Sequence, residues 1–211
     1  MTDEPGIFEV MYSTRAMRRL KPDAVPEELL LKLIDAANQA PSGSNAQTAR
    51  WLVVRDREQV RRIAELNRKA IEAYTGPNSA RPASLPHQDA GRRARQLKAL
   101  KWQAGHMQDF PAVIVACQEM AGPKREAWAA GAGAGGSVWP GVQNLLLAAR
   151  ALGLGATLTT LPMMDRTAFR AILGLPENVE PFCIVPIGWP AGKFGPVTRR
   201  PVSEILHWDR W

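Results

Sequence analysis

The segment from Ala40 to Val54, APSGSNAQTARWLVV, constrains the fold most, because it joins an amphipathic helix to an apolar strand through a small-residue loop. The polar side chains of this loop, all of short reach, are Ser42, Ser44, Asn45 and Gln47. Gly43 lets the backbone approach a ligand closely or adopt positive φ. Residues of these types also dominate ordinary turns. The segment is therefore either a plain connector or a ligand-binding loop.

A cluster of arginines lies upstream of this loop, at Arg15, Arg18 and Arg19. Guanidinium groups donate paired hydrogen bonds at fixed geometry and keep their charge, so they suit phosphate and the carbonyl edge of a heterocycle. A solvated basic turn would have the same composition. Apolar residues then recur at helical spacing between Leu29 and Ala37, which predicts a core helix that leads into the polar loop.

Hydrophobic periodicity along the chain predicts a short sheet surrounded by helices. The expected helices span 26–39, 57–74, 90–102, 138–152 and 165–173, and the expected strands span 51–54, 112–117, 156–158 and 182–187. Three prolines and many small polar residues predict that 74–88 is a loop within the domain. The chain of 211 residues shows no internal repeat and no linker, so we expect one domain over 1–211.

Side-chain chemistry excludes several classes of enzyme. Cys117 and Cys183 lie in apolar, strand-like runs, which predicts buried free thiols and no metal-spaced pair. The three histidines, His87, His106 and His207, are dispersed, and we interpret them as structural or solvent-facing. No Ser/His/Asp, Cys/His or paired-carboxylate arrangement stands out. We therefore predict no catalytic side chain and no metal site.

The glycine run GAGAGG at 131–136 matches the G-x-G-x-x-G spacing of dinucleotide-binding sites. That fingerprint requires a preceding buried strand and an acidic residue about 20 positions further on. The preceding KREAWAA is not strand-like, and no acid lies near 155–157. We interpret the glycines as the lead-in to the helix at 138–152.

The net charge of +7 raises the question of a nucleic-acid partner. The basic run at 91–106 has the pattern of a solvated helix face, and no zinc spacing or aromatic RNA-binding motif accompanies it. Positive potential instead favours attraction of small anionic ligands. No apolar run reaches the ~20 residues of a membrane span, and MTDEPGIFEV lacks the pattern of a signal peptide. We expect a cytoplasmic protein with neither a nucleic-acid nor a membrane partner.

Four segments in order along the chain resemble the FMN-dependent nitroreductase family. They are the arginine cluster with its helix, the APSGSNAQ loop, GSVWPGVQNLLLAARALGLGATLTTL at 136–161 and FCIVPIGWPAGKFGPVTRRPVSEIL at 182–206. The resemblance implies an α+β nitroreductase-like fold. It also implies a homodimer with FMN at the subunit interface, and Trp208 and Trp211 are candidates for packing against the partner.

The resemblance also implies which residues bind the cofactor. Arg15 matches a position near the phosphate or the ribityl chain of FMN, and Arg199 matches one that meets the phosphate. Arg18, with Arg19 as a weaker candidate, matches a position near the pyrimidine edge of the flavin. The partner subunit would contribute Ser42, Ser44, Asn45 and Gln47, and the turn beside the ring would contain Gly155, Leu158 and Thr159.

The chain departs from the family pattern at Thr14, Ala16, Thr48 and Val197, where arginine, serine, proline and lysine are common. These departures concern the affinity for phosphate, for which Arg200 or Lys193 could compensate.

The activity implied by the resemblance is a ping-pong transfer of hydride from NADH or NADPH through FMN to a nitroaromatic, a quinone or a related electron-poor acceptor. The cofactor carries this chemistry, in agreement with the lack of a catalytic side chain. Because a fold does not fix a reaction, flavin fragmentation, dehalogenation and reduction of an activated alkene stay open. A flavin-binding protein with little turnover is a further alternative.

Overall fold

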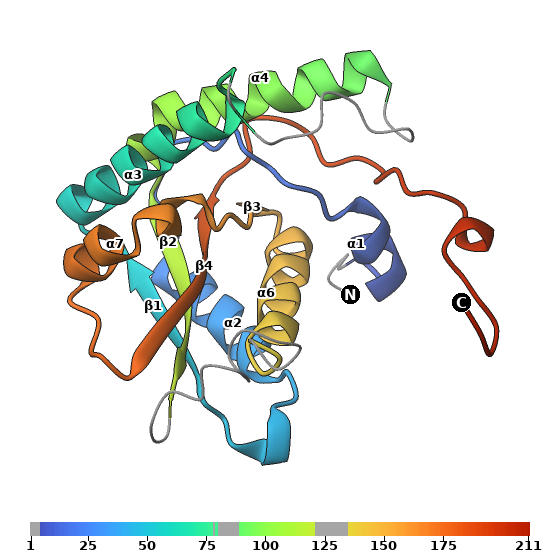
Figure 1. Cartoon of the computed structure of the whole chain (residues 1–211), viewed down its shortest axis with the longest axis horizontal. Coiled ribbons are helices and arrows are strands. Elements are labelled where there is room, and N and C mark those ends of the chain that lie inside the picture. The colour runs from blue at the N-terminus through green and yellow to red at the C-terminus, as the bar shows by residue number, and fades with distance from the viewer. Residues whose placement is uncertain (1–4, 78, 80–88, 121–134) are drawn as a thin grey trace.

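The computed structural model describes residues 5–77, 79, 89–120 and 135–211. Within them lies a four-stranded antiparallel sheet in the order β1-β2-β4-β3. Its strands are β1 (Ala49–Val54), β2 (Ala112–Glu119), β3 (Gly155–Ala156) and β4 (Val179–Gly188). Helices cover this sheet, so the fold class is α+β as predicted (Figure 1).

The central strand β2 is buried on both faces, which explains its unbroken apolar run. Ala112, Ile114 and Ala116 belong to one buried cluster, whereas Val113, Val115 and Cys117 belong to a second cluster on the opposite face. The side chains of a strand alternate between the faces of a sheet. The sheet therefore separates two hydrophobic cores.

The first core lies between the sheet and the helices α2 (Glu27–Asn38) and α6 (Trp139–Ala151). These two helices pack closely at Gly141, where a Cβ would lie 2.8 Å from Trp51 Cζ2 and 2.9 Å from the carbonyl oxygen of Ala37. A larger residue at this position would force the helices apart.

The second core lies under α3 (Arg57–Thr75) and α7 (Arg166–Leu173). Asp56 begins α3 as an N-cap, because its Oδ1 accepts a hydrogen bond of 2.9 Å from the backbone N–H of Gln59. The helix α4 (Ala90–His106) packs on α3, and α1 (Ile7–Ser13) packs on α6.

The predicted elements are confirmed with shifted ends. The helix expected at 90–102 extends to His106, and the strand expected at 156–158 contains only Gly155 and Ala156. The helix α1 was not predicted, because only Val10 of its residues is buried and no periodic stripe marks it. Much of the loop predicted at 74–88, with His87, and the glycines at 131 and 133 lie outside the described residues.

The two cysteines are buried free thiols, as predicted. They belong to different cores, one on each face of the sheet. Burial raises the pKa of Cys117 to about 11 and that of Cys183 to about 12. Both are therefore protonated at neutral pH and unsuited to nucleophilic chemistry.

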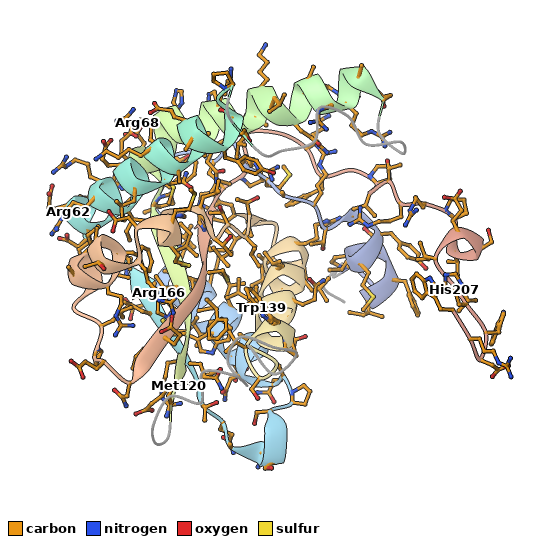
Figure 2. All side chains as sticks on the ribbon, in the orientation of Figure 1. Arg62, Arg68, Met120, Trp139, Arg166 and His207 are labelled. Carbon is orange, nitrogen blue, oxygen red and sulfur yellow. The ribbon has the colours of Figure 1, made fainter. Side chains whose placement is uncertain are left out.

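The C-terminal tail, residues 192–211, runs past α1 and ends far from the sheet, where Figure 2 labels His207. Every residue from Thr198 onward is exposed. Trp208 and Trp211 are 80% and 101% exposed. The tail therefore presents large apolar side chains without burying them in its own chain.

Candidate functional site

The arginine segment, defined here as residues 15–20, is bound into the body of the protein by backbone hydrogen bonds. The N–H of Met17 donates to the carbonyl of Ala156 over 2.9 Å. At the other end, the N–H of Ala191 donates to the carbonyl of Arg19 over 2.9 Å, and Leu20 forms a β-bridge with Pro190. The fold thus brings the predicted arginines together with β3 and the beginning of the C-terminal tail.

Gly155 allows β3 to approach the arginine segment closely. A Cβ at this position would lie 2.6 Å from Leu20 Cδ2 and 3.2 Å from Met17 Cβ. Only glycine fits without displacing these side chains. Gly155, predicted to lie in the turn beside a ligand, therefore also permits the close packing of the arginine segment on β3.

Arg18 has the most unusual environment of the predicted residues. Its side chain is partly buried, and burial lowers the pKa of the guanidinium while the nearby Tyr74 opposes this shift. No acceptor among the described residues forms a hydrogen bond or an ion pair with it. A desolvated cation that lacks a hydrogen-bond acceptor is costly. Arg18 is therefore suited to an anionic or carbonyl-rich ligand.

Arg15 and the tail lie close together. The Nη1 atom of Arg15 is 3.7 Å from the position that a Cβ on Gly195 would take, and the N–H of Val197 donates to the carbonyl of Tyr12 over 2.8 Å. Arg199 follows on the exposed part of the tail, where its Nη1 donates to the carbonyl of Thr198 over 2.9 Å. Arg19 is exposed as well.

The turn after β3 contains a polar group that the sequence analysis missed. Thr157 is 1% exposed, and its Oγ1 has no hydrogen-bond partner among the described residues. Leu158 is 36% exposed, whereas the backbone of Thr159 pairs with Ile184. The threonine-rich run gave no signal that distinguishes the buried hydroxyl from its neighbours.

The loop at 42–47 is strained and largely exposed. Ser44, Asn45 and Gln47 have φ values of 54°, 52° and 48°, in the left-handed region that non-glycine residues rarely occupy. The Oγ of Ser42 accepts a hydrogen bond of 3.0 Å from the N–H of Gln47, and the Oγ of Ser137 accepts one of 3.1 Å from Gly43. Strain of this kind is typical of ligand-binding segments.

The loop and the arginine segment lie at opposite ends of β2 (Figure 1). Ala49, just after the loop, pairs with Gln118, whereas Ala112 pairs with Ile187, next to the Gly188 that pairs with Gly155. Strand geometry places residues 112 and 118 about 20 Å apart. One chain therefore does not bring the two groups of predicted residues together.

Comparison with known proteins identifies the family. The pattern described as the Nitroreductase family matches residues 11–189. The chain belongs to the nitroreductase family. It is 28% identical over 208 residues to a putative NADH dehydrogenase/NAD(P)H nitroreductase of Methanothermobacter thermautotrophicus, spanning 97% of this chain and 87% of the relative. It is 31% identical over 205 residues to an NADH dehydrogenase of Thermus thermophilus, spanning 92% and 91%.

Solved structures show the same fold. A structure of iodotyrosine deiodinase bound to FMN and 3-iodo-L-tyrosine matches with a TM-score of 0.74 at 25% identity, covering 98% of this chain and all of the other. A putative NADH dehydrogenase/NAD(P)H nitroreductase of Parabacteroides distasonis matches with a TM-score of 0.67 at 25% identity, covering 99% of this chain and all of the other. The predicted nitroreductase-like fold is thus confirmed.

The described residues include neither a membrane-spanning helix nor a cluster of metal-ligating side chains. None of their helices is both long and apolar enough to cross a membrane. Nor do these residues contain a group of three or more His, Cys, Asp or Glu side chains that could hold a metal ion.

Proposed function

We propose that this protein is an FMN-dependent oxidoreductase, with NADH or NADPH as reductant and an electron-poor small molecule as acceptor. The observation that carries the proposal is Arg18, a partly buried guanidinium without a hydrogen-bond acceptor among the described residues. Membership of the nitroreductase family, and relatives named NADH dehydrogenase or NAD(P)H nitroreductase, support it.

The residues around Arg18 fit the parts of FMN. Arg18 would meet the dioxopyrimidine edge, and the unpartnered Oγ1 of Thr157 supplies a buried hydroxyl nearby, next to the β3 residue that binds Met17. Arg15 and Arg199 would contact the phosphate through charged hydrogen bonds. When bound, FMN accepts and returns a hydride. The chain's own task is to bind, orient and electrostatically stabilise the flavin.

The polar loop at 42–47 would complete the site from a second copy of this chain. The proposal rests on the separation of the loop from the arginine segment along β2 and on the strain that the loop retains. Large exposed apolar side chains offer a surface for the partner: Ile7, Phe8, Tyr12, Trp208 and Trp211. We therefore propose a homodimer.

Reductive dehalogenation is the second candidate reaction. The iodotyrosine deiodinase structure has a higher TM-score than the Parabacteroides structure, and a deiodinase of Thermotoga neapolitana is 27% identical over 204 residues, spanning 95% of each chain. In this reaction two electrons and one proton convert a carbon–halogen bond to a carbon–hydrogen bond and release halide. Nitro or quinone reduction releases none.

The test begins with the absorption spectrum of the purified protein, in which bound flavin is expected. Anaerobic stopped-flow mixing with NADH and with NADPH then measures flavin reduction. Reoxidation of the reduced flavin is then measured with a panel of nitroaromatics, quinones and halophenols, and the release of halide is measured in parallel. A protein that binds flavin but is reduced by neither nucleotide would be a carrier. Failure to bind FMN at all would contradict the proposal.

A further inference from the structure

Arg150, in the last turn of α6, contacts two other segments at once. Its side chain is only 16% exposed. The Nε atom donates a hydrogen bond of 2.8 Å to Ser13 Oγ, and Nη2 lies 3.6 Å from Glu9 Oε1. The guanidinium carbon lies 4.5 Å from the centre of the Phe194 ring. One cation therefore joins α6, the C-terminal end of α1 and the start of the C-terminal tail.

Two of the residues that contact Arg150 lie close to Arg15, a proposed phosphate-binding group, one along the chain and one in space. Ser13 precedes Arg15 by two positions, and α1 ends between them, where Thr14 Oγ1 donates to the carbonyl of Val10 over 2.7 Å. Phe194 immediately precedes Gly195, beside which Arg15 Nη1 lies. Arg150 thus contacts both of the segments that meet beside Arg15.

Few other interactions hold these segments in place. In α1 only Val10 is buried, and the tail is exposed from Thr198 onward. One backbone hydrogen bond, from Val197 to Tyr12, joins α1 to the tail directly. Charged hydrogen bonds and cation–π contacts in a partly buried setting are stronger than neutral, exposed ones. Arg150 therefore provides much of the coupling between α1 and the tail.

We propose that Arg150 is a positioning residue for phosphate recognition. It holds Arg15 and the tail that carries Arg199 in one arrangement, and it does not itself contact the flavin. The inference rests on the proposed function, because it requires that the FMN phosphate binds at these arginines. It predicts an effect on FMN and none on riboflavin, which has the same ring system but no phosphate.

The test compares the dissociation constants of FMN and riboflavin, measured by quenching of flavin fluorescence. Arg150→Met retains much of the apolar stem and removes the charge. The FMN constant should rise about tenfold, as expected for a weakened charged contact, while the riboflavin constant stays within about twofold. Arg150→Lys keeps a charge near Glu9 and should recover part of the FMN affinity.

Arg57→Met is the matched control. Arg57 also joins two segments, because its Nη1 and Nη2 donate to the carbonyls of Phe110 and Gln108 over 2.8 and 2.6 Å. This variant should lower the melting temperature without changing the ratio of the two constants. The same result for Arg150→Met, or an equal loss of both ligands, would overturn the proposal and leave Arg150 a purely structural residue.

Ser13→Ala keeps the test informative if Arg150→Met does not fold. It removes the acceptor of the 2.8 Å bond, together with the 2.6 Å hydrogen bond that the hydroxyl donates to the carbonyl of Glu9, and it should shift the FMN constant in the same direction by a smaller factor. A wild-type chain that binds neither ligand would end the FMN proposal, and this inference with it. Wild-type binding with an unchanged ratio in both variants would refute the role of Arg150 alone.

Discussion

The arginine segment and the loop at 42–47 contain most of the predicted ligand-binding residues, yet the fold holds them in opposite ways. Backbone hydrogen bonds to β3 and to the tail fix the arginine segment, and its Met17 and Leu20 are buried. The loop is largely exposed, contains three left-handed residues and is held mainly by short local hydrogen bonds. One region is rigid and cationic, whereas the other is strained and neutral.

The difference supports the proposal that the site is divided between two chains. A cation that is already desolvated gains from a ligand by electrostatic pairing. A strained polar loop could gain by surrounding a ligand with short hydrogen bonds, because backbone strain is typical of ligand-binding segments. Because the two regions lie about 20 Å apart along β2, two chains in a symmetric dimer would form two equivalent sites.

The largest effect is expected for paired variants that test whether each site combines the arginines of one chain with the loop of the other. Arg15→Ala/Arg18→Met removes the cations, and Asn45→Asp/Gln47→Glu puts negative charge on the loop, so each homodimer should lose its FMN. A heterodimer of the two, purified through two different tags, contains one site with every change and one with none. It should retain about half of the wild-type flavin, since symmetric dimers have equivalent sites.

Absorbance at the flavin bands per heterodimer measures this retention, with a tagged wild-type dimer as the control. Heterodimers as empty as both parents would show that each site takes its arginines and its loop from the same chain, which would contradict the division between two chains. If light scattering gave the wild-type protein the mass of a single chain, that result would contradict the proposed homodimer directly.

The second prediction concerns Arg15 and Arg199, the arginines proposed to bind the phosphate of FMN. Arg15→Ala and Arg199→Ala should each raise the dissociation constant for FMN roughly ten- to a hundredfold, from the 1.5 to 3 kcal/mol typical of a charged hydrogen bond. Arg62→Ala is the control, because Arg62 is an exposed residue in the N-terminal part of α3, away from the arginine segment (Figure 2). Equal affinities in all three variants would remove both arginines from the site.

The third prediction concerns Arg18, which is proposed to lie beside the flavin ring. Arg18→Met removes a charge that would stabilise the anionic reduced flavin, so the reduction potential should fall by about 30 mV, equivalent to about 1.4 kcal/mol for two electrons. Hydride transfer from the nicotinamide should also slow. Potentiometric titration measures the shift, and Arg62→Met, at an exposed position of α3 outside the proposed site, is the control with little expected effect. Equal potentials would place Arg18 away from the ring.

The fold could be read from the sequence where periodicity is strong. The stripes of α2 and α3 predict helices because apolar residues repeat at the helical period, whereas β2 was predicted from its short, unbroken apolar run. The helix α1 buries only Val10, and the third strand contains two residues. Neither is long enough for a periodic signal, so tertiary contacts alone define them.

Less of the candidate site could be predicted from the sequence, because burial and hydrogen-bond pairing are properties of the folded chain. Polar residue types and spacing singled out Arg18 and the 42–47 loop. They could not indicate that Arg18 lacks a partner, that Thr157 is buried, or that Arg150 joins α1 to the tail. The separation of the loop from the arginines also follows from strand order and register, which a single sequence does not specify.

The smallest expected effect tests whether the loop is strained. Ser44 has a φ of 54°, so Ser44→Gly removes the left-handed cost of about 1 kcal/mol while adding a smaller entropic cost. The free energy of unfolding of the FMN-free protein should rise by a few tenths of a kcal/mol. Ser42→Gly is the matched change, because Ser42 has an extended φ of −127° and its Oγ accepts a hydrogen bond from Gln47. That variant should lose about 1 kcal/mol. Urea unfolding of both variants measures the sign of each change in the free energy of unfolding. If both variants were destabilised, the loop would hold no backbone strain at Ser44.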